Sequence, residues 1–133
     1  MIRVLSLGAG VQSTAVLLMS CKGALPKLDA AVFADTQWEP AAVYHHLEWL
    51  EIEAGRHGIP VHRVSAGNIR EDALNFQVRG RQDGGRRWAS MPYFTKTDGL
   101  GKGGQIRRQC TGEYKIQPIE RFIRRELLGL QLG

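Results

Sequence analysis

Cysteine is scarce in this chain of 133 residues, and long apolar runs are missing altogether. The two cysteines, Cys21 and Cys110, are too few for a disulfide framework or for a metal site built from cysteine alone. No apolar run approaches the roughly 20 residues that cross a membrane, and the first residues lack the pattern of a secretory signal. We therefore expect a cytoplasmic protein with free thiols and no membrane partner.

Metal-ligating residues are sparse as well. His45 and His46 fall on one expected helix, and His57 and His62 each stand alone. None of them lies at the spacing from cysteine or carboxylate residues that a metal centre requires. The sequence therefore predicts no metal site.

The positive charge of the chain is concentrated in one segment. The formal net charge is +5, and the segment from Arg79 to Arg108 alone carries eight basic and two acidic residues, a net +6. Seven glycines also fall between residues 80 and 105. A local excess of positive charge attracts an anion, either the phosphates of a nucleotide or a nucleic-acid backbone. We expect residues 80–105 to form a mobile insertion that closes over an anionic substrate.

Elsewhere, short apolar runs alternate with amphipathic stretches. The runs predict strands at residues 2–5, 29–34 and 60–64, with a further short strand at 92–95. Helices are expected at residues 13–22, from 39 or 40 to about 54, at 68–78 and at 116–127. This alternation favours a parallel sheet with helices on both faces. The length favours a single domain, residues 1–133.

Local signals refine three of these helices. Asn68, with Glu71 three residues later, is typical of a helix N-terminus. Apolar residues recur at helical spacing in the second and last helices, which predicts one apolar face on each helix. In the second helix they are Val43, Leu47, Leu50 and Ala54. In the last helix they are Ile116, Ile119, Phe122, Ile123 and Leu127.

The most informative stretch is residues 4–16. A short apolar strand is followed by the small residues Gly8, Ala9 and Gly10, and then Ser13 and Thr14 open an apolar helical run. Such a loop exposes backbone N–H groups, and the helix N-terminus adds about half a positive charge. The combination binds phosphate. We expect the amides of residues 10–13 to be donors, while the Ser13 hydroxyl either joins them or only caps the helix.

This loop resembles the pyrophosphate loop (PP-loop) of the N-type ATP pyrophosphatases, and it is most similar to that of the phosphoadenosine phosphosulfate (PAPS) reductases. The family's loop usually reads Ser-Gly-Gly-x-Asp-Ser, and residues 8–13 match it at Gly10 and Ser13. Gly8 stands where Ser is usual, Ala9 where Gly is usual, and Gln12 where Asp is usual. Replacement of that Asp removes a carboxylate that could hold magnesium beside the phosphates.

Two later segments resemble the same family. Residues 32–40 are similar to its second strand and Asp-Thr-Gly turn, which here reads Asp35, Thr36 and Gln37. Residues 107–119 resemble its later cysteine-containing turn and the Lys-x-x-Pro start of a helix, with Cys110 and Lys115 in those places. The three segments occur in the family's order and together span most of the chain.

The resemblance implies an α/β fold, a three-layer sandwich whose mainly parallel, Rossmann-like sheet of the HUP type is flanked by helices. It also implies an enzyme that acts on ATP or on an adenylyl sulfate such as PAPS, by ATP cleavage, sulfur transfer or reduction. The implied nucleotide-binding residues are Ser6, Gly8, Ala9, Gly10, Val11, Gln12, Ser13, Thr14, Asp35, Thr36 and Trp38. The implied catalytic residues are Arg107, Arg108, Cys110 and Lys115. Their three cations would neutralise charge on the reacting phosphate or sulfate.

The sequence contains neither the C-terminal Glu-Cys-Gly motif of the family's reductases nor the paired cysteines that hold an iron–sulfur cluster in related members. We therefore expect no such cluster. Cys110, beside Arg107 and Arg108, is either a reactive thiol or a structural one. A further C-terminal portion and a homodimer are both compatible with the resemblance.

Two other functions stay open. Gly8, Gly10 and Ser13 half-match the Gly-x-Gly-x-x-Gly fingerprint, and Asp35 follows at the spacing typical of a dinucleotide-binding domain. The chain could instead be a non-enzymatic module that binds nucleotide, or nucleic acid through the segment from Arg79 to Arg108. Asp35 either contacts the ligand or stabilises the turn, and Trp38 either packs on the nucleotide or covers the next helix.

Overall fold

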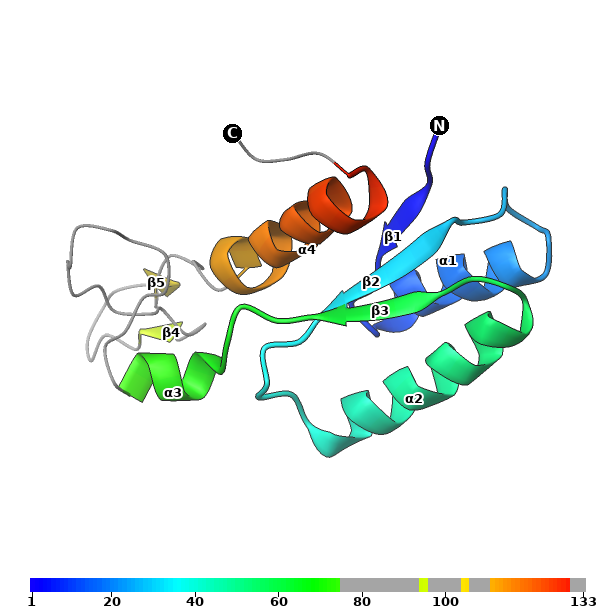
Figure 1. The fold of residues 1–133 in the computed structure, drawn as a ribbon. Helices are drawn as coiled ribbons and strands as arrows, with labels where there is room; N and C mark the ends of the chain where they lie inside the picture. The colour runs from blue at the N-terminus through cyan, green and yellow to red at the C-terminus, as the bar shows by residue number, and fades with distance from the viewer. Residues whose placement is uncertain (75–93, 96–103, 106–110, 130–133) are drawn as a thin grey trace.

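The computed structural model describes residues 1–74, 94–95, 104–105 and 111–129. Its centre is a parallel sheet of three strands in the order β1-β2-β3, namely β1 (Val4–Ser6), β2 (Ala30–Ala34) and β3 (Val61–Val64) (Figure 1). All five residues of β2 are buried, because helices cover both faces of this central strand. The register pairs Ser6 with Val32 and Ala34 with Val64, so the carboxyl ends of the strands meet at one edge.

Two helices, α1 (Val11–Cys21) and α2 (Ala41–Arg56), cover one face of the sheet. The stripe predicted on α2 is confirmed, since Leu47, Leu50 and Ala54 are buried and Val43 packs beside them. The side chains of this core are Leu7, Leu17, Ala31, Phe33, Leu47, Leu50, Ala54 and Ile59. Helix α1 begins at Val11, two residues before the predicted start, because the extended Gly10 already accepts a hydrogen bond from Thr14 N–H over 3.0 Å.

On the opposite face lies α4 (Gln117–Phe122), which continues from the π-helical turn η1 (Thr111–Ile116) into a second one, η2 (Ile123–Leu127). Ile119 packs on Val32 and Ala34, with Phe122 and Ile123 beside it. The prediction that Ile116 belongs to this stripe was wrong, since its side chain is 49% exposed. The wider turn of η1 ends at Ile116, so the 3.6-residue period of α4 does not extend back to it.

Short elements complete the described chain. Asn68 Oδ1 accepts hydrogen bonds from the amides of Arg70 and Glu71, which confirms the predicted start of α3 (Ile69–Leu74). The strands β4 (Phe94–Thr95) and β5 (Gly104–Gln105) pair antiparallel. The described residues thus form a mixed α/β fold with a small open parallel sheet. None of their helices is long and apolar enough to cross a membrane.

Candidate functional site

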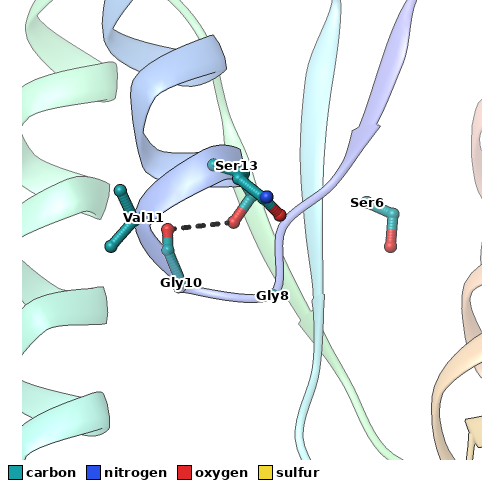
Figure 2. A pocket seen from close by; sticks show the side chains of 6 residues that line it. Ser6, Gly8, Gly10, Val11 and Ser13 are labelled. Carbon is teal, nitrogen blue, oxygen red and sulfur yellow. Dashed lines mark hydrogen bonds between the residues drawn. The ribbon is translucent and has the colours of Figure 1, made fainter.

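Residues 8–13 connect β1 to α1 at the carboxyl edge of the sheet, and we call them the 8–13 loop. They border an open depression of about 590 Å³ lined by Ser6, Gly8, Gly10, Val11, Gln12 and Ser13. Figure 2 shows Ser6 and Val11 on opposite sides of the loop, with Gly8 and Gly10 between them. The loop therefore leaves its backbone accessible at the edge where parallel sheets bind ligands.

The described residues place no acidic side chain at the N-terminus of α1. Gly10 is its N-cap and has no side chain to accept a hydrogen bond, and its first turn contains no acidic residue. The Ser13 hydroxyl donates instead to the Gly10 carbonyl over 3.4 Å, so it does not cap the helix (Figure 2). The amides of Val11, Gln12 and Ser13 donate to no acceptor in the described part of the chain. These donors and the helix dipole favour an anionic ligand here.

Backbone conformation separates the three small residues of the loop. Ala9 has φ of 56°, in the left-handed region that favours glycine. Gly8 and Gly10 have no such φ, and a Cβ there would meet nothing closer than Ser13 Oγ at 4.0 Å from Gly8. The fold itself therefore does not require glycine at position 8 or 10. A ligand that comes close to the backbone would require it, because a side chain there would block its approach.

The turn after β2 is built around Asp35. Its Oδ1 accepts hydrogen bonds from the Gln37 amide and from the Tyr44 hydroxyl, each over 2.7 Å. Asp35 therefore stabilises the turn, which was one of the two roles predicted for it from the sequence. Its Oδ2 accepts no hydrogen bond from the described residues. Trp38, in the same turn, is 52% exposed.

Two polar side chains after β3 fix the same turn. Ser65 Oγ donates to the Asp35 carbonyl over 2.8 Å and accepts from Gln37 Nε2 over 3.0 Å. Asn68 Nδ2 donates to the Gln37 carbonyl over 3.4 Å. These contacts hold Gln37 at φ of 59°, a second left-handed residue that is not glycine. Ser65 was not predicted from the sequence, although a polar residue directly after a parallel strand indicates a position at the ligand-binding edge of a sheet.

One predicted cation reaches this edge. Lys115 Nζ lies 4.0 Å from Glu39 Oε1, which also accepts a hydrogen bond from the buried Thr36 hydroxyl over 3.0 Å. The structure therefore places Lys115 and Thr36 beside the turn after β2. Arg107, Arg108 and Cys110 lie outside the described residues, as do nearly all of the 80–105 insertion and of the basic segment from Arg79 to Arg108.

Thr14, a predicted ligand contact, faces α2 instead. Its Oγ1 lies 2.9 Å from His46 Nε2, and the His46 ring stacks on Trp49 with centroids 5.9 Å apart. Thr14 does not line the depression at the 8–13 loop. The Thr14–His46 pair instead connects the first turn of α1 to α2. The two residues are too distant in sequence for a local pattern to indicate this contact.

The electrostatics of the site centre on the Asp35 turn. Burial raises the pKa of the Tyr44 phenol, and its hydrogen bond to Asp35 raises it further. Among residues 1–74 and 111–129, no three His, Cys, Asp or Glu side chains come together as a metal centre would need. Comparison of the chain with known protein families, curated proteins and solved structures gives no match.

Proposed function

We propose that this protein binds the phosphates of an adenine nucleotide at the 8–13 loop, as an enzyme of the PAPS reductase or N-type ATP pyrophosphatase kind acting on ATP or an adenylyl sulfate. The observation that carries the proposal is the first turn of α1, whose leading amides find no acceptor among the described residues. It offers the amides of Val11, Gln12 and Ser13, without a capping side chain or an acidic residue, to an open depression at the carboxyl edge of the sheet.

Backbone conformation supports the resemblance on which the reaction class depends. The described residues contain two non-glycine residues with positive φ, Ala9 and Gln37. Both occupy positions where the family's loop and turn have glycine. At the two positions where another residue replaces the family's glycine, the chain therefore keeps the conformation that glycine favours.

We further propose the family's three-layer, HUP-type sandwich as the architecture. The order β1-β2-β3, with α1 and α2 on one face and α4 on the other, is compatible with half of such a sheet. Trp38 would stack on the adenine and Lys115 would neutralise phosphate charge. Gln12 supplies no carboxylate for magnesium, and Arg107, Arg108 and Cys110 remain proposed contributors to the reaction.

Thermal unfolding with a panel of ligands tests the proposal, because a ligand that binds only the folded state raises the melting temperature. We expect ATP or PAPS at millimolar concentration to stabilise the protein and adenosine to have little effect. Gly10→Val should abolish the shift while leaving the fold intact, since no described atom lies within 4 Å of the added Cβ. Gly55→Val is the matched control, because it also enters open space, away from the loop.

An unchanged ATP and PAPS response in folded Gly10→Val protein would reject the 8–13 loop as the site. A shift with NAD that exceeds the shift with ATP would favour the second candidate, a dinucleotide-binding domain. The observation for that candidate is Asp35 at the carboxyl end of β2. Its Oδ2 accepts no hydrogen bond from the described residues and would accept one from a ribose hydroxyl.

A further inference from the structure

A second depression lies on the far side of the sheet, between the end of β3 and the helix formed by α4 and η2. Its volume is about 190 Å³, well above the roughly 10–15 Å³ that one water molecule needs. The wall beside the strand comprises Val64, Ser65 and Ala66, and the wall beside the helix includes Arg121 and Arg125. We call this depression the arginine pocket.

The arginine pocket concentrates positive charge. Arg121 and Arg125 are four residues apart, so they project from the same side of the helix into one depression. Neither forms an ion pair with a described residue. Glu126 is the one acidic residue among the described residues of the lining, so these residues together carry a net positive charge.

The walls of the pocket are held by contacts elsewhere. The Ser65 hydroxyl is bonded to the Asp35 carbonyl and the Gly67 amide, which fixes the turn after β3. On the helix side, Phe122 packs on the His62 ring with centroids 4.8 Å apart, and Pro118 is buried. A firm wall beside two guanidinium groups suits a tetrahedral oxyanion, which accepts paired hydrogen bonds from arginine.

The geometry points to the arginine pocket as a binding site for a phosphate or sulfate group, separate from the 8–13 loop. The two places lie at the ends of β1 and β3, two strand spacings apart, which is about 10 Å across the sheet. The oxyanion belongs either to a separate small molecule or to a ligand that also occupies the loop. The site itself does not depend on the nucleotide proposal, because none of its residues belongs to the 8–13 loop.

Titration with inorganic sulfate and inorganic phosphate, followed by NMR of the arginine Nε–H groups, tests the site. We expect saturable shifts at Arg121 and Arg125. Arg121→Gln/Arg125→Gln should weaken this binding at least about tenfold, because each guanidinium loses charge-assisted hydrogen bonds to the anion. Arg124→Gln is the matched control, since Arg124 is exposed on the same turn but does not line the pocket. All three side chains are exposed, so the variants should fold.

Saturable shifts at Arg121 and Arg125 that survive in Gly10→Val protein support the site and assign the oxyanion to a separate molecule. Shifts at these arginines produced only by ATP or PAPS, and lost in Gly10→Val protein, support the site and assign it to a ligand held at the loop. Equal, non-saturating shifts at Arg121, Arg124 and Arg125 with every anion indicate general ionic screening and overturn the proposal. Unchanged affinity of the Arg121→Gln/Arg125→Gln variant for sulfate and phosphate would also overturn the proposal.

Discussion

The Tyr44 hydroxyl donates a hydrogen bond to Asp35 Oδ1 over 2.7 Å and thereby joins the first turn of α2 to the carboxyl end of β2. The same oxygen accepts the amide of Gln37, whose φ of 59° is costly for a residue with a side chain. Tyr44 therefore orients the carboxylate that holds the left-handed residue in place. Trp38 follows Gln37 directly, so its position depends on that arrangement.

Replacing Tyr44 tests this coupling. Tyr44→Phe should lower the free energy of unfolding by about 1 kcal/mol, because the phenol ring keeps its packing while Asp35 loses one of two donors. Urea denaturation measures the change. In an Asp35→Asn background the same substitution should cost less, since the charged acceptor is gone. Equal costs in both backgrounds would show that the charge of Asp35 does not strengthen the hydrogen bond.

The same phenol gives the stability a pH dependence. Burial and the bond to Asp35 raise the pKa of Tyr44 above its ordinary value of about 10. The unfolded chain then loses its proton first, so this contribution is complete below pH 10 and declines as the pH rises toward the folded pKa. Wild-type protein should lose more stability between pH 9 and pH 11 than Tyr44→Phe, on the order of a few tenths of a kcal/mol. Cys21, whose thiol pKa is raised by burial and by Glu53, contributes equally to both proteins. Parallel curves for the two would contradict the assignment.

Much of the fold could be predicted because its signals are local. The apolar run of β2 and the stripe of Leu47, Leu50 and Ala54 on α2 each identify a buried surface without knowledge of the partner. The π-helical turns around α4 could not be predicted, since nothing in the sequence marks a change of helical period. For that reason Ile116 was misplaced.

The candidate site was predicted less completely. The small residues of the 8–13 loop identify a backbone that a ligand can approach, and the depression lies there. The partners that fix the Asp35 turn come from two other elements, Tyr44 on α2 and Ser65 after β3, and they are separated from Asp35 by 9 and 30 residues. Thr14 likewise contacts His46, which is 32 residues away in the sequence. Such pairs depend on how strands and helices pack, so a linear motif cannot reveal them.

Glycine at position 9 would relieve the strain at Ala9, although it also removes the methyl group that packs against the core. Ala9→Gly should raise the free energy of unfolding by up to about 1 kcal/mol, because glycine adopts φ of 56° without the Cβ clash, although it adds entropy to the unfolded chain. Nucleotide binding should be retained or improved, since the loop keeps its shape. Thermal and urea unfolding of Ala9→Gly beside Ala15→Gly provide the comparison. Ala15 is an exposed residue within α1, where glycine should destabilise. A loss of stability at both positions would show that Ala9 is not strained.

Charge at Lys115 should matter in proportion to the phosphate charge of the ligand. Its ammonium lies 4.0 Å from Glu39 Oε1 and is 48% exposed, so it can turn toward an anion at the edge of the sheet. Lys115→Met should weaken ATP binding about two- to fivefold, as expected for an exposed ion pair, affect AMP less and leave adenosine unchanged. The effect should shrink as ionic strength rises. Lys22→Met is the matched control, because Lys22 is exposed at the opposite end of α1. Calorimetric titration of the three ligands measures the series. Equal losses for adenosine and ATP would show that Lys115 acts through the folded structure rather than through the phosphates.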